Sequence, residues 1–439
     1  MRHAPVAFGE AARYWIRLGF VNFGGPSGQI ALMHEDLVER RGWIDEPRFL
    51  HALGFCMLLP GPEAQQLAIY VGWLLHGAAG GILAGVAFVL PSAVLMLGLS
   101  WAYAVHGDVD WVAGVFGGLA AGVLGMVVAA VFRIGGRALR PFGAALAVTT
   151  FIAIFLLGVP FPLIVVGAGV IGAVVARARP GLLRAGDPAV DEPPPLNRRA
   201  RLSVRRTLRV LAVGLVVWWT PLLAVIAWRG PGDTLSTEAL FFSGAAVVTF
   251  GGAYAVLAFV NQAAVIRYGW LTPGDVVAGL GLAESTPGPL IMVVQFVGFL
   301  AAYRFPGDLD PLVAGMIGSA VTVWATFAPC FLWILLGAPY IERLRSNRRL
   351  SGALAAITAS VVGVIASLAV TFGTNVLFDR VEETTPLGAP VPVPAATSIR
   401  PFALVLAVAA FVAIRRFRAN PALVAVACGA AGLVRALVD

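Results

Sequence analysis

The sequence predicts an all-α polytopic membrane protein made of two homologous halves in an inverted-topology repeat, with about 13 transmembrane segments. The first observation behind this fold class is composition: 59% of the 439 residues are hydrophobic, only 12% are charged, and the mean hydropathy is +0.87. The second is that a set of helix-breaking motifs occurs twice, 227 residues apart. So apolar a chain requires many spans. Its continuous apolar runs exclude a β-barrel, whose strands alternate over about 10 residues.

The duplicated motifs are Phe-Gly-Gly, Gly-Trp and Pro-Gly-Pro. They occupy residues 23–25, 42–43 and 60–62 and return at 250–252, 269–270 and 287–289. From Val21 to Pro62, 14 of 42 positions match their partner without a gap. Paired interruptions of apolar segments at matching places in two halves are the best sequence indication of a transporter's binding site.

Thirteen apolar segments are candidate spans, six before and seven after a polar stretch that carries nine Arg between Arg177 and Arg209. They are 11–33, 49–77, 78–104, 111–132, 141–159, 162–176, 209–228, 238–262, 274–303, 311–338, 351–372, 400–414 and 421–437. Whether the two Pro-Gly-Pro segments cross or re-enter is open. This division predicts a first transporter half (1–176), a cytoplasmic Arg/Pro-rich linker (177–208) and a second half (209–439) with one extra leading span.

The charge distribution predicts the topology. All 31 basic residues are Arg, and the net charge is +8. With the N-terminus and the linker in the cytoplasm, 23 of the 31 fall on the cytoplasmic side, as the positive-inside rule requires, and the C-terminus is external. The extra span at 209–228 then inverts the second half relative to the first.

The same composition bounds the partners. Scattered Arg residues indicate contact with the lipid bilayer and give no nucleic-acid patch. Three separated Cys and five His without ligand spacing predict no metal site and no cofactor. A homo-oligomer is possible and is not decided by the sequence.

The interrupted helices predict an anion site. A helix broken within the membrane leaves free backbone N–H groups at the start of its second part, and the helix dipole adds to their attraction for an anion. Pro62 and Pro289 lie where new helices would begin. We expect an oxyanion to bind at Asn22, Gly24, Gly25, Ser27, Gly61, Gln65, Gln66, Thr249, Gly251, Gly252, Ser285, Thr286 and Gly288. The alternatives are close helix packing at Gly-Gly and a surface turn at Pro-Gly-Pro.

Two carboxyl groups at membrane depth, Glu63 and Glu284, are candidates for proton coupling. A charged side chain at the bilayer centre costs about 2.5–3.5 kcal/mol on insertion scales, so acidic residues kept there are functional candidates. Ionised, they would repel a dianion, and we therefore expect them to carry protons. Glu63 has the alternative of stabilising the first turn of its helix.

The duplicated arrangement resembles the chromate ion transporter (CHR) family in its long two-domain form. Leu18-Gly19-Phe20 before the first Phe-Gly-Gly, and Leu58-Leu59 before Pro60-Gly61-Pro62, extend the similarity. It covers both halves apart from the linker and the tail. The resemblance implies an inner-membrane secondary transporter that exports chromate and confers resistance. The halves differ where Pro26-Ser27 becomes Ala253-Tyr254 and Met57 becomes Glu284, so they are not expected to contribute equivalent ligands.

Two other functions fit parts of the sequence. A carrier of another oxyanion, such as sulfate, would need the same donors, because sulfate shares the charge and shape of chromate. Gly25-Pro26-Ser27-Gly28 also fits the nucleophile motif of intramembrane serine proteases, which would need His51 or His76 within reach. The chain has no ATP-binding loop, so transport would depend on an ion gradient or a partner.

Overall fold

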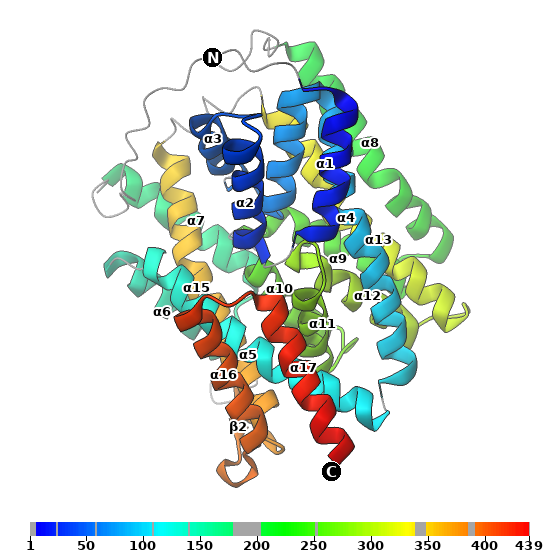
Figure 1. The fold of residues 1–439 in the computed structure, drawn as a ribbon, viewed down its shortest axis with the longest axis vertical. Helices are drawn as coiled ribbons and strands as arrows, with labels where there is room; N and C mark the ends of the chain where they lie inside the picture. The colour runs from blue at the N-terminus through cyan, green and yellow to red at the C-terminus, as the bar shows by residue number, and fades with distance from the viewer. Residues whose placement is uncertain are drawn as a thin grey trace.

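The computed structural model describes residues 6–22, 25–57, 59–107, 109–138, 141–178, 203–250, 253–338, 348–384 and 391–438. Most of the predicted linker, and with it that boundary, lies outside these residues. Figure 1 shows a helical bundle with α1, α2 and α3 at one end and α16 and α17 toward the other.

The elements of the first half are all helical. They are α1 (Phe8–Val21), α2 (Gly25–His34) with its π-helical extension η1 (Glu35–Arg40), α3 (Glu46–Cys56), α4 (Glu63–His106), α5 (Asp110–Ala138), α6 (Pro141–Phe155) and α7 (Phe161–Ala178). Helix α8 (Val204–Arg229) follows and packs against α9 and α13.

The second half adds a short β-hairpin to the same kind of helices. Its elements are α9 (Thr234–Val248), α10 (Ala253–Asn261) with η3 (Gln262–Arg267), α11 (Pro273–Ser285), η4 (Leu290–Met292), α12 (Val293–Arg304), α13 (Pro311–Gly337), α15 (Arg348–Leu377), β1 (Val381–Thr384), β2 (Val391–Pro394), η6 (Ala396–Ser398), α16 (Pro401–Phe417) and α17 (Pro421–Val438). Strands β1 and β2 pair antiparallel.

The second half repeats the first helix by helix. The π-helical segments η1 and η3 begin 227 residues apart, as do α3 and α11. The offset grows to 238 at α5 and α15, after the inserted loop 305–310, and to 260 at α7 and α17, after the inserted β-hairpin. Equivalent residues also cap α3 and α11, because the Asp45 and Thr272 side chains both accept a backbone N–H of the first turn. The repeated architecture of a polytopic helical protein is therefore confirmed.

The first two apolar segments are hairpins rather than single interrupted spans. Glu10, near the start of α1, pairs with Arg41 beyond η1 at 3.5 Å, so α2 runs back along α1. His76 Nε2 lies 2.9 Å from the carbonyl oxygen of Val6, so the first part of α4 also returns to the end where α1 begins. Helix α4 then reverses at Gly77, whose φ of +66° suits glycine.

The corresponding segments of the second half are built in the same way. Arg304, at the end of α12, pairs with Asp275, near the start of α11, at 2.7 Å. Leu235, near the start of α9, packs with Ala302 and Ala314. The segments 11–33, 49–77, 238–262 and 274–303 therefore each reverse direction. The Pro-Gly-Pro motifs, and the described residues that flank the Phe-Gly-Gly motifs, lie at the inner tips of the helical hairpins.

Each half completes the packing of the other. Helices α16 and α17 pack on α5, and the equivalent α6 and α7 pack on α15. Small residues allow the backbones to approach closely: a Cβ atom at Gly118 would lie 2.1 Å from the carbonyl oxygen of Cys428, and one at Gly172 would lie 2.4 Å from that of Gly352. The two halves are thus interleaved across these interfaces.

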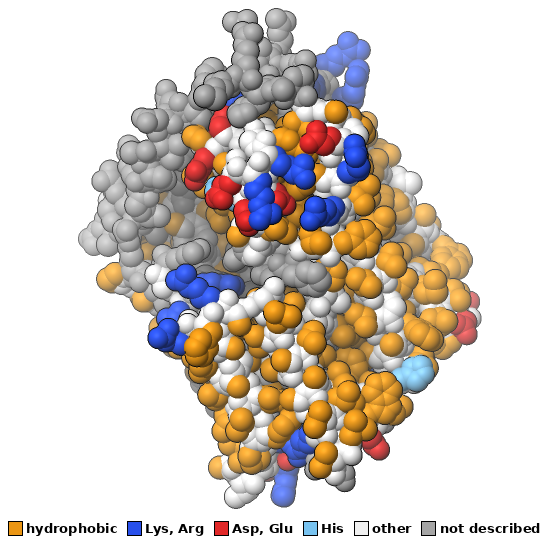
Figure 2. All heavy atoms as spheres, in the orientation of Figure 1, with side chains coloured by type: hydrophobic (Ala, Val, Ile, Leu, Met, Phe, Trp, Pro, Cys, Tyr) orange, Lys and Arg blue, Asp and Glu red, His pale blue; other side chains and the backbone are white. Residues whose placement is uncertain are grey.

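The outer surface fits a bilayer. Within the described residues, seven helices are long and apolar enough to cross a membrane: Glu63–His106, Asp110–Arg133, Phe161–Ala178, Val204–Arg229, Pro311–Gly337, Gly352–Leu377 and Pro421–Val438. Figure 2 shows hydrophobic side chains over most of the visible surface, with charged ones gathered over the α1–α3 end. This is a multi-pass membrane protein.

Candidate functional site

The inner tips of the hairpins contact each other across the two halves. The Gly61 N–H donates to the carbonyl oxygen of Thr249 at 3.0 Å, and the Gly288 N–H donates to that of Asn22 at 3.2 Å. Residues 61 and 288 are 227 apart, as are 22 and 249, so the same contact is made twice. Each Pro-Gly-Pro tip is therefore bonded to the residue that precedes the other half's Phe-Gly-Gly.

Both tips require glycine. Gly61 has φ +108° and Gly288 has φ +122°, a region that other residues rarely adopt. A Cβ atom at Gly288 would lie 2.3 Å from the Ser92 side chain, and one at Gly61 would lie 3.0 Å from Cys330 Sγ. Ser92 and Cys330 are themselves equivalent, because each follows the proline inside its helix, α4 or α13.

Gln29 holds the first Phe-Gly-Gly hairpin to the second Pro-Gly-Pro tip. Its Nε2 donates to the carbonyl oxygens of Asn22, at 3.0 Å, and of Gly288, at 2.5 Å. Gln66 Nε2 donates to the carbonyl oxygen of Pro60 at 2.6 Å and so supports the first Pro-Gly-Pro tip. Gln29 was not predicted from the sequence, because it lies one turn beyond the motif.

Among the buried side chains of the described first half that keep unused hydrogen-bonding groups, three have no hydrogen bond at all and belong to the tips or to α4. The amide groups of Asn22 and Gln65 and the hydroxyl of Ser92 have no hydrogen-bond partner among the described residues. All three side chains are at most 1% exposed. Buried polar groups without partners are uncommon and costly, so donors in this state are suited to a ligand that supplies the missing acceptors.

The remaining predicted ligands differ in availability. The hydroxyls of Thr249, Ser285 and Thr286 donate to carbonyl oxygens of their own helices, at 2.6, 2.9 and 3.3 Å. Gly25 begins α2 with φ +64°. Gly24, Gly251, Gly252 and the side chain of Ser27 lie outside the described residues. The tips therefore form two pairs, Gly61 with Thr249 and Gly288 with Asn22, and Gln66 supports the first, whereas the hydroxyls on α11 are occupied locally.

The acidic residues differ in burial. Glu284 is 4% exposed near the end of α11, and Glu63 is partly exposed at the first position of α4. Glu238 on α9 is 0% exposed and was missed. The sequence did contain a signal, since Glu238 is the first residue of the apolar segment 238–262. At a segment boundary, however, sequence gives no indication of burial.

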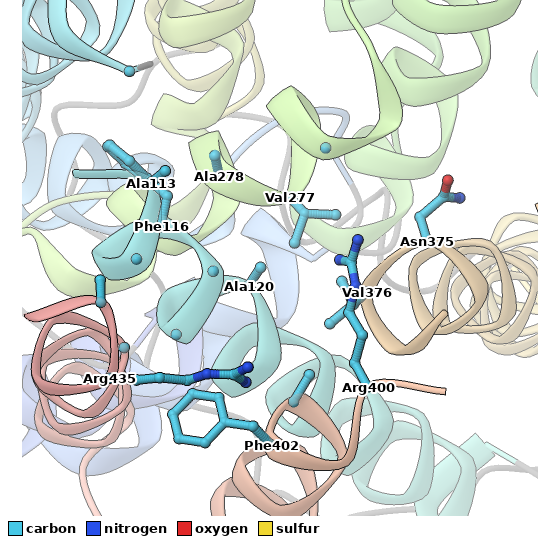
Figure 3. Close-up of a pocket in the computed structure, with 18 of the residues that line it drawn as sticks. Ala113, Phe116, Ala120, Val277, Ala278, Asn375, Val376, Arg400, Phe402 and Arg435 are labelled. Carbon is cyan, nitrogen blue, oxygen red and sulfur yellow. The ribbon is translucent and has the colours of Figure 1, made fainter. Parts of the chain in front are cut away.

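A cavity of about 500 Å³ lies between α5, α11, α15, α16 and α17. Figure 3 shows the side chains of Arg400 and Arg435 directed into it. The Arg435 guanidinium lies 4.8 Å from the centre of the Phe402 ring, and Arg400 pairs with Asp379. Helix α11 lines the cavity from Gly274 to Ala278 and then continues to the second Pro-Gly-Pro tip.

The family model described as "Chromate transporter" matches residues 9–173 and 237–433, which include both sets of hairpins. The chain belongs to the chromate transporter family. Members of this family are transporters and not enzymes, which removes the serine-protease alternative. In addition, His76 lies at the open end of its hairpin, whereas Ser27 belongs to the first turn after the inner tip.

Two named chromate transport proteins align with most of this chain, and a further transporter aligns with about a third of it. It is similar to the "Chromate transport protein" of Cupriavidus metallidurans (32% identity over 376 residues, 84% of each chain) and to that of Pseudomonas aeruginosa (31% over 387 residues, 87% of this chain and 84% of that one). The "Uncharacterized transporter YwrB" of Bacillus subtilis is 33% identical over 141 residues, 32% of this chain and 72% of that protein. No solved structure matches this chain.

Proposed function

We propose that this protein is a secondary transporter that exports chromate across the inner membrane, driven by an ion gradient. The observation that carries the proposal is the reciprocal bonding of the hairpin tips, which brings the backbone of both halves together beside buried, unpartnered amides of the first half. The chromate transport proteins to which the chain is similar support the choice of substrate.

A tetrahedral dianion suits the donors near the tips. Asn22 Nδ2, Gln65 Nε2 and Ser92 Oγ can all donate hydrogen bonds, and none of them carries a charge. In a low-dielectric site, neutral donors bind an anion without the cost of desolvating a cation. Sulfate would satisfy the same donors, and it is the alternative substrate.

The repeat suggests how access alternates. The hairpins of each half meet those of the other tip to tip, as expected for an inverted-topology pair with a midplane site. We assign the N-terminus to the cytoplasm and the C-terminus to the outside. On this assignment the cavity with Arg400 and Arg435 is the external vestibule, and its guanidinium groups attract the oxyanion. Beyond it, Leu119 of α5 lies against Gly281 of α11, between the cavity-lining part of that helix and the second Pro-Gly-Pro tip.

A carboxyl group near the tips supplies the coupling. Glu284 is buried on α11, two residues before Thr286, and protonation would remove its repulsion of the dianion. Protonation and oxyanion binding then favour each other. Glu63, at the start of α4, is the second residue assigned to proton coupling.

The test is transport by the purified protein in vesicles. Labelled chromate uptake into inverted vesicles should saturate, respond to an imposed proton gradient and be competed by excess unlabelled chromate more strongly than by sulfate. Equal or stronger competition by sulfate would reassign the substrate. The absence of saturable uptake of either oxyanion would overturn the proposal.

A further inference from the structure

Glu238 is a carboxyl group inside the helical bundle with no counter-charge in contact. Its side chain is 0% exposed, and neither carboxyl oxygen has a hydrogen bond within 3.5 Å among the described residues. The backbone of Ala302 on α12 is its polar neighbour. An ionised carboxylate in such surroundings would be very costly, and in practice such a group takes up a proton instead. Acidic residues inside membrane bundles commonly mark proton paths.

The charged groups near Glu238 are committed elsewhere. On its own helix, Asp233 caps the first turn and pairs with Arg229 of α8 at 2.9 Å. Arg229 also pairs with Asp308 of the loop before α13. Helix α13 contains no charged residue, and the cation of α12, Arg304, pairs with Asp275. None of these cations is therefore available to neutralise Glu238, so its charge must be neutralised by a bound cation. A proton is the simplest such cation, because it needs no other ligands.

A chain of buried contacts links Glu238 to the hairpin tips. Glu238 Oε2 lies against Gly318 of α13, where a Cβ atom would be 2.8 Å away. The next residue, Ser319, accepts a hydrogen bond from Gln295 Nε2 at 2.8 Å. The same Nε2 also donates to the carbonyl oxygen of Ala93 at 2.8 Å. Ala93 follows Ser92, whose side chain packs on Gly288 at the second Pro-Gly-Pro tip.

The part of this chain from Glu238 to Gln295 has no counterpart in the first half. The repeat offsets place Ala11 at the position of Glu238, Ala68 at that of Gln295 and Gly81 at that of Ser319. None of these first-half residues can hold a proton or donate a side-chain hydrogen bond. Structural needs common to both halves therefore do not account for Glu238 and Gln295.

We infer that Glu238 is a proton-binding site of the transport cycle and that Gln295 is a positioning residue that transmits its protonation state to the Gly288 tip. The inference rests on the proposed function, because it names a coupling ion and its site. Loss of the proton would place an unpaired charge between α9 and α13 and favour a state in which water reaches Glu238. The movement of α13 would then be passed through Ser319 and Gln295 to Ser92 and Gly288.

The experiment measures how many protons accompany each oxyanion in proteoliposomes, from the pH gradient that just balances a chromate gradient. Glu238→Gln should lower this ratio by one, and Glu238→Asp should keep the wild-type ratio. Gln295→Leu should preserve binding but shift the pH profile. Glu10→Gln is the matched control, since Glu10 adjoins the equivalent position of the first half and is half exposed, and it should leave the ratio unchanged.

Chromate exchange at equal concentrations, without a pH gradient, distinguishes a failure of the proposed transport function from a failure of the role assigned to Glu238. Wild-type protein that exchanges no chromate would refute the proposed function. Exchange-competent Glu238→Gln protein with an unchanged proton ratio, or transport driven equally well by a sodium gradient, would overturn the role of Glu238. Thermal unfolding of each variant, with and without chromate, identifies a variant that has lost its fold, and in that case Glu238→Asp and Gln295→Leu decide the question.

Discussion

The two halves have the same backbone conformation at the hairpin tips, but they carry different polar side chains around them. Both have glycine at the Pro-Gly-Pro tip with positive φ, both donate that N–H to the other half, and both have a π-helical segment at the same register. Around the tips, however, Gln29, Gln65 and Gln66 of the first half correspond to Val256, Met292 and Val293 of the second. Conversely, the second half alone carries Glu238 and Gln295.

The difference follows from what each feature requires. A reciprocal backbone bond exists only if both halves adopt the same local conformation, so glycine and proline occur at both places. A ligand or a proton needs one set of side chains, and a second copy would leave more polar groups buried without partners. The frame is therefore duplicated, whereas the buried amide donors at the tips and Glu238 each occur in one half.

The first prediction tests the inversion itself, with an all-or-none result. In a variant lacking Cys56, Cys330 and Cys428, single cysteines at Glu39 and at Arg267 should be labelled from opposite sides by an impermeant thiol reagent. Arg267 is equivalent to Arg40 in the repeat, so the two cysteines lie one residue from equivalent positions, within η1 and η3. If both cysteines were labelled from the same side, the halves would be parallel copies and would not form an inverted-topology pair.

The second prediction concerns the tips. Gly288→Ala should abolish transport and lower the unfolding temperature, because it adds a backbone strain of about 1–3 kcal/mol to a clash with Ser92. Gly61→Ala should be milder, since its neighbours at 3.0 Å are the ends of Cys330 and Gln66 side chains. Adding Ser92→Gly to Gly288→Ala should recover part of the stability. Equal damage at the two tips would show that strain alone matters and that the local packing does not.

The third prediction separates stability from binding in the polar half. Gln65→Leu removes a buried amide without partners, so it should stabilise the empty protein by about 1–3 kcal/mol while weakening chromate binding about tenfold or more. Met292→Leu, at the equivalent position, is the control and should change neither. The measurements are thermal unfolding without substrate and chromate affinity from exchange. A Gln65→Leu protein that binds normally would exclude Gln65 from the site.

The smallest effect is expected at the loop 305–310, before α13. Hydrogen bonding from Arg229 holds the pKa of Asp308 below its ordinary value of about 3.9. A lowered carboxyl pKa contributes stability above the unfolded-state pKa, and this is lost only as the pH falls through the folded value. Asp308→Asn should therefore leave the pH dependence of transport unchanged from pH 5.5 to 8. A shifted profile would mean that the loop, and not Glu238 or Glu284, titrates in this range.

The duplication in sequence was sufficient to predict the helical repeat and the helix interruptions at Pro60–Pro62 and Pro287–Pro289. It did not predict that the apolar segments double back, because length and hydrophobicity are the same for a crossing helix and for a hairpin whose tip holds two glycines. Each half contains two such hairpins, so the number of crossings changes by an even number. The loops outside the hairpins keep their predicted sides. The loops that join the two hairpins of each half, 34–48 and 263–273, exchange sides, because Arg41 lies beside Glu10 at the start of α1.

The site was predicted where a motif marked it and missed where tertiary contacts create it. Asn22, Gly61 and Gly288 adjoin or belong to the motifs; Gly288 bonds Asn22, and Gly61 bonds Thr249. Ser92 lies in the middle of a long apolar helix, and its role depends on packing against a residue 196 positions away, which no local pattern encodes. Gln295 likewise bonds residues of two other helices.

The interleaving of the halves also governs how the chain is assembled. Helix α5 is synthesised early, but the helices that cover it, α16 and α17, leave the ribosome much later. The Gly61 amide likewise acquires its partner only when Thr249 arrives. The first half must therefore remain in the bilayer with its interface facing lipid until synthesis ends, a period in which its small-residue surfaces are open to wrong partners. Completion of the C-terminal helices is thus the step that commits the whole molecule to its native packing.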